Sequence, residues 1–150
     1  MKISTILKPS LIKLSLESED KEELFEEMVD LFVQDGCIKD RATAIQVLEE
    51  RETRMSTGIS NGLGLPHNKL PEAKDILIGL GISQKGIDYD SLDGEPVYIV
   101  ITIFASEDKP GQHIQVLAEI ARLFSISGFL DKLRLAKSVE EVINLIKAEE

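Results

Sequence analysis

A glycine-rich segment that ends in Pro66-His67 combines the residue types best suited to nucleophilic chemistry. A neutral imidazole is a nucleophile, and its ordinary pKa of about 6.5 leaves it largely uncharged near neutral pH. Glycine lets backbone N–H groups approach an anion, and the ring of Pro66 fixes its own φ and so stiffens the chain before His67. The pattern fits attack on a phosphoryl group, but on spacing alone a Pro-His pair after a glycine-rich turn is more often only a loop.

Side chains around this segment have the donors that phosphoryl transfer requires. The phosphoryl oxygens need hydrogen-bond donors and positive charge around an exposed, oriented ring. Arg51 offers a bidentate clamp, and Ser56 and Thr57 offer hydroxyl groups. The sequence therefore predicts a phosphate-cradling set made of Ser56, Thr57, Gly58 and Gly62.

The second histidine, His113, opens a helical pattern with Leu117, Ile120 and Phe124 on one face. It is either a first-turn residue without chemistry or a partner of His67. The sequence does not give the distance between the two rings, so both interpretations stay open at this point.

Motifs for several other chemistries are missing. The chain has no G-x-x-x-x-G-K-[ST] loop for nucleotide phosphates and no G-x-G-x-x-G run that opens a helix after a strand. Two histidines and one cysteine without close ligand spacing predict no metal site, and no cofactor is predicted. Cys37 is better explained as a small apolar residue near a helix end than as a phosphoryl acceptor.

The formal net charge of −10 says little about function by itself but bears on the class of partner. An acidic chain without a cluster of Lys and Arg repels nucleic acid and anionic membranes and suits basic partner proteins. A single cysteine excludes an internal disulfide and fits a reducing compartment. The N-terminal residues lack the apolar run of a signal peptide, and no segment reaches the length of a membrane span. These features predict a cytoplasmic location without membrane insertion.

The elements that must position these residues are buried strands between helices. Continuous apolar runs over 76–82 and 97–105 predict central strands, 11–17 a short strand, and 56–67 a hairpin-like loop. Capping residues and glycines predict the helices, which begin at Asp20 (ending near Gly36), at Asp40, after Pro110-Gly111, over roughly 126–136, and at Ser138. The length of 150 residues fits one domain, 1–150, with a sheet sandwiched by helices.

The run R-E-T-R-M-S-T-G-I-S-N-G-L-G-L-P-H, from Arg51 to His67, closely resembles the active-site segment of a known family. This family is the enzyme IIA domains of the bacterial sugar phosphotransferase system, fructose/mannitol class, which includes the nitrogen-regulatory relative. Its pattern is approximately R-E-x3-S-T-G-I-G-x-G-x-A-x-P-H. A second signature, H-[LI]-x-x-L-A-x-[IL]-A, is similar to residues 113–121, and residues 86–97 also fit. The resemblance covers nearly the whole chain in order.

The resemblance implies a role for each candidate residue. His67 would take a phosphoryl group, at Nε2, from the phosphohistidine of the general carrier HPr. His113 would lie beside it and hydrogen-bond the phosphoryl group, and Arg51 would neutralise charge. The fold implied is α/β, a three-layer α/β/α arrangement with a mixed central sheet flanked by helices, and the domain itself needs no metal or cofactor.

Two positions depart from the family pattern. Ser60 stands where the family usually has glycine, and Gly64 stands where it usually has alanine. Ser60 adds a side chain in a tight turn, and Gly64 is expected to make the approach to His67 more flexible. Neither change removes a reacting group, so the activity is still expected.

Two functions remain open on this resemblance. A sugar-transport carrier, a transferase, would pass the group from His67 to a cysteine of the IIB component of a fructose- or mannitol-type permease; we prefer this interpretation. A nitrogen-regulatory protein would instead bind target proteins according to the phosphorylation state of His67. The run H-N-K-L over 67–70 resembles the H-G-K-L of that branch. The intact set of Arg51, His67 and His113 argues against a pure interaction domain.

Overall fold

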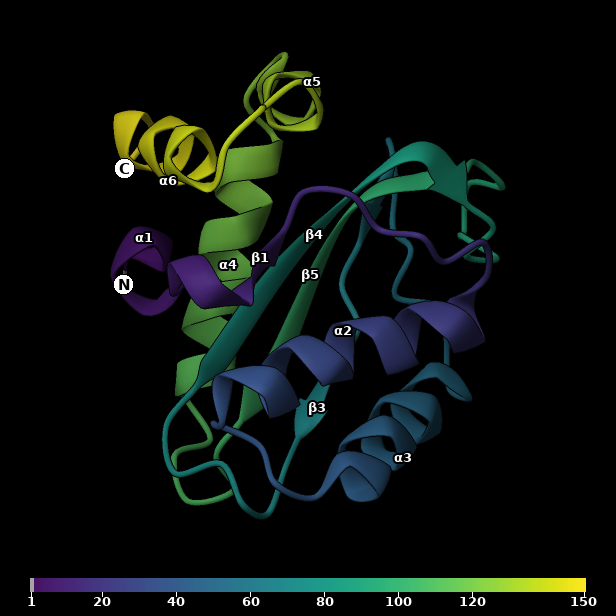
Figure 1. Cartoon of the computed structure of the whole chain (residues 1–150), viewed down its shortest axis with the longest axis vertical. Coiled ribbons are helices and arrows are strands. Elements are labelled where there is room, and N and C mark those ends of the chain that lie inside the picture. Colours follow the sequence, from purple (N-terminus) through teal and green to yellow (C-terminus); the bar gives the residue numbers. More distant parts are fainter. Residues whose placement is uncertain (1) are drawn as a thin grey trace.

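The two long apolar runs form the centre of one mixed sheet in the computed structural model (Figure 1). β4 (Leu77–Ile87) and β5 (Val97–Ala105) pair antiparallel, and β1 (Ile12–Lys13) pairs parallel to β4. β2 (Leu63–Gly64) and β3 (His67–Lys69) both pair parallel to β5, on the side away from β4. The order β1-β4-β5-β2, with β3 also beside β5, confirms the mixed central sheet.

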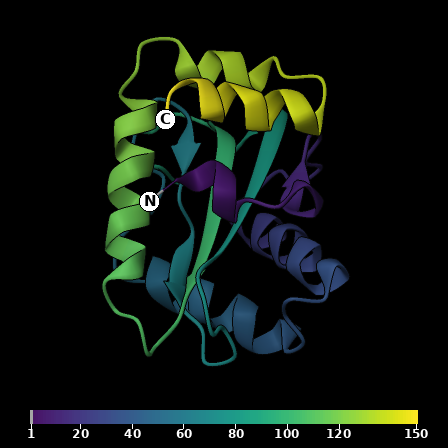
Figure 2. The ribbon, with the colours of Figure 1, turned by 90° about the vertical axis from the view of Figure 1, so that its left-hand side faces the viewer.

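Helices cover both faces of the sheet, in agreement with the three-layer α/β/α prediction (Figures 1 and 2). The structure describes residues 2–150, and the helical elements there are α1 (Ile3–Ile6), the 3₁₀ turn η1 (Pro9–Leu11), α2 (Lys21–Asp35), α3 (Arg41–Glu52), α4 (Gln112–Phe124), α5 (Phe129–Arg134) and α6 (Val139–Ala148). One layer consists of α2 against β4 and α3 against β3, whereas α4 and α5 pack on the other face. None of the helices described has the length and apolar content of a membrane span.

Three predicted helix starts are confirmed by their capping bonds, whereas the helix predicted over roughly 126–136 is shorter, at Phe129–Arg134. The carboxylates of Asp20 and Asp40 accept backbone N–H bonds three residues onward, at 2.9 and 3.1 Å. The Ser138 hydroxyl oxygen does the same at 3.1 Å. Gly36 ends α2 with φ +91°, a conformation that glycine adopts without strain.

The strand predictions are correct in place but not always in length. The strand predicted over 11–17 is wrong at both ends, because η1 takes Leu11 and only Ile12–Lys13 pair with β4. β4 continues past the predicted end at Ile82 to Ile87, because a register shift and Gly86 at φ +93° let the strand resume pairing. The strand predicted over 97–105 is confirmed as β5.

Two glycines of β4 determine how closely α2 approaches the sheet. A Cβ at Gly79 would lie 2.8 Å from Phe32 Cζ, and one at Gly81 would lie 2.9 Å from Met28 Sδ. Both distances are shorter than a van der Waals contact. The close packing of α2 on β4 therefore requires glycine at these two positions. The alternation of glycine with Ile and Leu in this strand therefore reflects packing.

Gly79→Ala should destabilise the fold by about 1–3 kcal/mol, because the new methyl group overpacks the Phe32 ring. Urea unfolding measured by circular dichroism should show a lower midpoint with an unchanged slope. Gly111→Ala is the matched control, since a Cβ there meets nothing within 4 Å. Equal midpoints for the two variants would contradict this account of the α2 layer.

Candidate functional site

β3 positions His67 because successive strand residues point to opposite faces of a sheet. The Asn68 amide donates a 2.7 Å hydrogen bond to the Val47 carbonyl oxygen of α3, so Asn68 faces the α3 layer. His67, which is aligned with Ile103 of β5, therefore faces the layer that contains α4. The half-buried imidazole thus lies where α4 passes the edge of the sheet.

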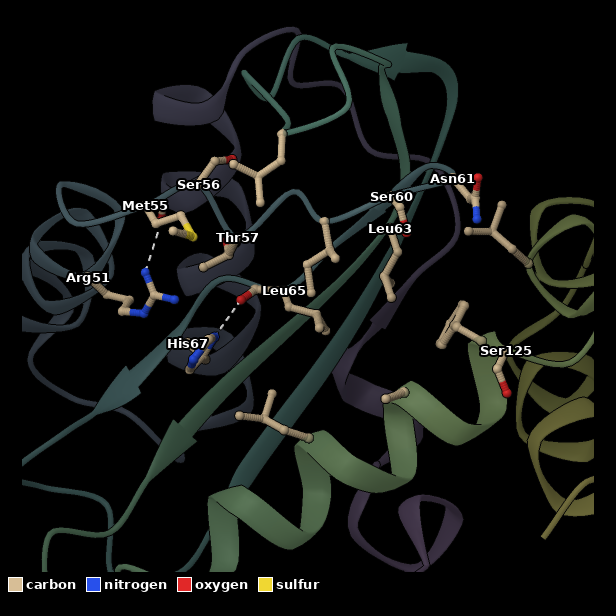
Figure 3. Close-up of a pocket in the computed structure, with 16 residues that line it drawn as sticks. Arg51, Met55, Ser56, Thr57, Ser60, Asn61, Leu63, Leu65, His67 and Ser125 are labelled. Atoms are coloured by element: carbon tan, nitrogen blue, oxygen red, sulfur yellow. Dashed lines mark hydrogen bonds between the residues drawn. The ribbon is translucent and has the colours of Figure 1, made fainter.

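The imidazole of His67 is oriented by its own chain. Its Nδ1 lies 2.6 Å from the Leu65 carbonyl oxygen (Figure 3). A carbonyl oxygen only accepts hydrogen bonds, so Nδ1 carries the proton of the neutral ring. The lone pair is then on Nε2, which makes Nε2 the nucleophilic atom.

The environment keeps this ring uncharged. Burial lowers the pKa of His67 below its ordinary value, and the Leu65 hydrogen bond partly opposes that shift. The positive charge of Arg51 and the nearby His113 lower the pKa further, whereas Glu52 raises it. Because the net shift is downward, the neutral nucleophile is the main form at neutral pH.

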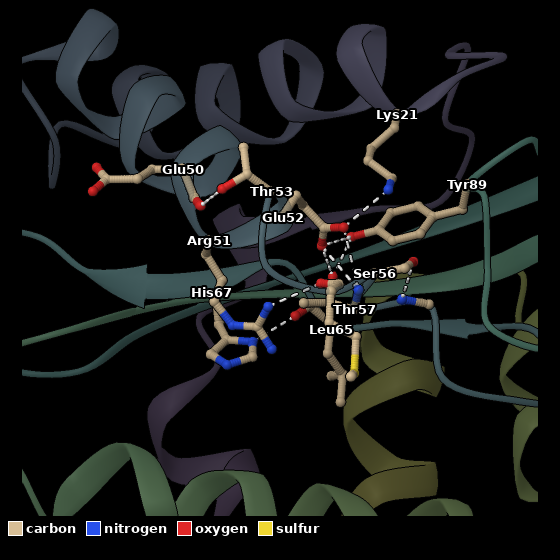
Figure 4. Close-up of polar contacts among 12 residues, drawn as sticks. Lys21, Glu50, Arg51, Glu52, Thr53, Ser56, Thr57, Leu65, His67 and Tyr89 are labelled. Carbon is tan, nitrogen blue, oxygen red and sulfur yellow. Dashed lines mark hydrogen bonds and ion pairs between the residues drawn. The ribbon is translucent and has the colours of Figure 1, made fainter.

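Arg51, His67 and His113 line one small cavity of about 260 Å³. Arg51 reaches it from the last turn of α3, with one guanidinium nitrogen bonded to the Met55 carbonyl oxygen at 2.9 Å and the group beside the His67 ring (Figure 4). His113 reaches it from the first turn of α4, and its Nδ1 is buried without a hydrogen-bond partner among residues 2–150. The fold therefore brings together the three residues that the sequence singled out.

Comparison with known proteins gives this arrangement a family. Residues 5–149 match the model of the family described as phosphoenolpyruvate-dependent sugar phosphotransferase system, EIIA 2. The chain belongs to this family.

Relatives of this EIIA chain carry two kinds of name. A fructose-specific EIIABC component of Bacillus subtilis is 34% identical over 146 residues, which are 97% of this chain but 23% of that protein. A fructose-specific EIIA component of Haloferax volcanii is 31% identical over 144 residues, 96% of this chain and 94% of the relative. The crystal structure of nitrogen regulatory protein IIA-Ntr from Neisseria meningitidis has a TM-score of 0.89 at 29% identity, covering 96% of this chain and 98% of that one.

Two basic residues of the EIIA site were missed by sequence reasoning. Arg54 and Lys69 line the same small cavity as His67. Their positions in the sequence could have indicated this, because Arg54 is three residues after Arg51 and Lys69 is two residues after His67. Lys69 follows His67 on the same face of β3, whereas Arg54 was treated only as a variable position of the motif.

The predicted phosphate-cradling set does not gather around the imidazole of the EIIA chain. Thr57 is buried, and both its N–H and its hydroxyl group bond to Glu52. The Gly58 N–H donates to the Ser56 hydroxyl oxygen at 3.1 Å, and Gly62 lies in a turn with φ +93°. Of the four, Ser56 and Thr57 line a cavity together with His67.

Packing explains the glycines of this segment. A Cβ at Gly58 would lie 2.7 Å from Tyr89 Cδ1, and a Cβ at Gly64 would lie 3.1 Å from Val97 Cγ1. Gly64 is paired with Val100 in β2, so its backbone is held by the sheet. The glycines therefore admit Tyr89 and Val97 into the core, and the flexibility expected at Gly64 is limited by that packing.

A larger groove of about 690 Å³ extends from His67 along α4 (Figure 3). Exposed apolar side chains form part of its rim, with Met55 59%, Ile59 48% and Leu92 59% exposed. Ser60 and Asn61 lie at the end remote from His67 (Figure 3). Contiguous exposed apolar surface of this kind is typical of a protein-binding face.

Among residues 2–150, no group of three or more His, Cys, Asp or Glu side chains is arranged to hold a metal ion. Burial, and then Asp35, raise the pKa of the Cys37 thiol to about 11, so this sulfur is a poor nucleophile. His67 is the better candidate for covalent chemistry.

The pKa of His67 should be below 6.5 in a histidine NMR titration, and Arg51→Ala should raise it, because that change removes a positive charge that disfavours imidazolium. Arg41→Ala is the control, since Arg41 pairs with Asp30 at the opposite end of α3. A wild-type midpoint at or above 6.5, or no upward shift in Arg51→Ala, would contradict the electrostatic description.

Proposed function

We propose that this chain is a phosphohistidine carrier in which Nε2 of His67 accepts a phosphoryl group and passes it on. The observation that supports this most directly is the Nδ1–Leu65 hydrogen bond, which leaves the lone pair on Nε2 in a ring beside Arg51. By the family resemblance, the donor is the phosphohistidine of HPr, and the acceptor is a cysteine of a IIB component. The proposal places these exchanges in the cytoplasm.

The residues account for both transfers without a metal. The Nε2 lone pair attacks phosphorus, a new N–P bond forms, and the N–P bond of the donor breaks with its electron pair returning to the donor imidazole. In the second transfer, a thiolate of the acceptor attacks phosphorus and the electron pair of the N–P bond returns to Nε2. The charge on the transferring oxygens is stabilised by Arg51 and by hydrogen bonding from His113.

The basic cavity and the apolar groove around His67 support a protein as the reaction partner. The phosphoryl oxygens would enter a cavity that Arg54 and Lys69 also line. The exposed apolar rim of the groove would contact the partner around the reacting atoms. Relatives named fructose-specific EIIA and EIIABC components support sugar transport as the process served.

A regulatory function is the second candidate, because of the similarity to IIA-Ntr from Neisseria meningitidis. Here a phosphoryl group on His67 would add negative charge at one end of the groove and so change which target proteins bind. Transfer from the phosphorylated chain to the cysteine of a fructose- or mannitol-type IIB protein decides between the two. Rapid transfer supports transport, and binding to targets that changes with phosphorylation, without transfer to IIB, supports regulation.

Incubation with phosphoenolpyruvate, enzyme I and HPr should add one acid-labile phosphoryl group to the wild type, and His67→Ala should add none. Intact-protein mass spectrometry measures the addition. Cys37→Ala is the matched control and should be labelled like the wild type. Labelling of His67→Ala would show that another residue is the acceptor.

His113→Ala should still accept the phosphoryl group but should pass it on about 100-fold more slowly, because one donor to the transferring oxygens is lost. Quench-flow measurement of both transfers gives the two rates separately. Gln115→Ala, an exposed change on the same helix, serves as the control. Unchanged rates in both directions for His113→Ala would remove this residue from the site.

A further inference from the structure

Glu52 follows Arg51 in α3 but turns into the protein, where its side chain is only 7% exposed (Figure 4). Its two carboxylate oxygens lie 3.0 and 3.2 Å from the Thr57 backbone nitrogen, and the Thr57 hydroxyl group donates to the same carboxylate. The Tyr89 hydroxyl donates at 3.3 Å, and the Lys21 ammonium forms an ion pair at 2.9 Å. Donors from three separate parts of the chain therefore converge on one carboxylate.

The partners of this carboxylate are themselves fixed. Tyr89 is fully buried, its hydroxyl lies 2.7 Å from the Thr57 hydroxyl oxygen, and the Lys21 ammonium lies 5.0 Å from the centre of its ring. Burial raises the pKa of Tyr89 well above its ordinary value, so the phenol keeps the proton that it donates. A buried carboxylate is costly unless its lone pairs are satisfied, and here they are. Such a saturated network holds Thr57 in one place.

Two further hydrogen bonds connect Thr57 to the reacting imidazole. The Leu65 N–H donates to the Thr57 carbonyl oxygen at 3.0 Å. The Leu65 carbonyl oxygen in turn accepts the bond from His67 Nδ1 at 2.6 Å. The Leu65 carbonyl oxygen selects the tautomer of His67, and its position depends on the position of Thr57. The position of Thr57 depends in turn on its hydrogen bonds to Glu52.

Glu52 also affects the direction of its neighbour. Consecutive residues of an α-helix point about 100° apart, since one turn contains 3.6 residues. With Glu52 tied to α2 through Lys21 and to the loop through Thr57, the last turn of α3 presents Arg51 to His67. One buried carboxylate thus restrains both Arg51 and His67.

We infer that Glu52 is a positioning residue for phosphoryl transfer, which holds the Leu65 carbonyl where it keeps His67 protonated at Nδ1 and so exposes the Nε2 lone pair. The inference rests on the proposed function for its effect on rate. Its effect on the tautomer of His67 does not depend on any transfer reaction.

The test combines ring-nitrogen NMR of His67 with the rate of phosphoryl transfer from HPr. The wild type should show one neutral tautomer, with the proton on Nδ1. Glu52→Gln should show a mixture of the two neutral tautomers of His67. Transfer should be at least about tenfold slower, as when residues that hydrogen-bond the ligands of metal sites are replaced. Glu50→Gln removes a charge from the same turn, at an exposed side chain outside this network, and should match the wild type in both measurements.

Variants of Thr57 and Tyr89 test the connection without removing the buried ion pair. Thr57→Val loses the hydroxyl bonds and should shift the tautomer in the same direction as Glu52→Gln, whereas Thr57→Ser should restore the wild-type tautomer. These variants, together with Tyr89→Phe, decide the question if Glu52→Gln fails to fold.

Two results would overturn the inference. Slower transfer in Glu52→Gln with an unchanged tautomer would mean that Glu52 acts only on stability or docking. A wild-type tautomer in every folded variant would remove the connection altogether. If the wild type accepts no phosphoryl group, the proposed function fails, whereas the tautomer measurement still decides whether Glu52 orients the ring.

Discussion

The hydrogen bond between His67 Nδ1 and the Leu65 carbonyl oxygen gives the imidazole its tautomer, and the surrounding fold keeps that oxygen in place. The backbone on either side of this carbonyl is held by hydrogen bonds. The Leu65 N–H donates to the Thr57 carbonyl oxygen, and the Pro66 carbonyl oxygen accepts from the Ile103 N–H at 3.1 Å. Proline has no N–H of its own, so the two-residue link between β2 and β3 leaves no donor unpaired at Pro66. The alternation of side chains along β3 then places the imidazole on the face that α4 covers, where His113 lies in the first turn of that helix.

The cavity beside His67 is lined by positive charge, whereas the chain as a whole is negatively charged. The chain carries a formal charge of −10, yet Arg51, Arg54 and Lys69 line the cavity beside His67. A phosphoryl group is thus attracted to a local positive site on a protein that repels most other polyanions. Among these cations, Arg51 also disfavours imidazolium, which helps to keep the ring of His67 neutral. In the proposed transfer, Arg51 would therefore act on both the phosphoryl group and the atom that receives it.

Local signals explain why much of the fold was predictable from the sequence. The caps at Asp20, Asp40 and Ser138 depend on neighbours within three residues, and β5 is a long apolar run, so both were identified. Pairing partners are not local, so the strand over 11–17 was predicted too long and the extension of β4 past Ile82 was missed. Within the site, the closeness of His113 and His67 depends on which face of β3 carries the ring. Thr57 was expected to bind phosphate, because the sequence does not reveal that the Glu52 side chain points into the protein and accepts hydrogen bonds from Thr57.

The most direct test of this account is to identify which nitrogen of His67 carries phosphorus. The protein is labelled with nitrogen-15 in its histidines, phosphorylated by phosphoenolpyruvate, enzyme I and HPr, and examined by nitrogen and phosphorus NMR. The account predicts phosphorus on Nε2, with Nδ1 still protonated and bonded to the Leu65 carbonyl. Phosphorus on Nδ1, or on a residue other than His67, would contradict it, because the hydrogen bond that organises the site would then have to break for the reaction to occur.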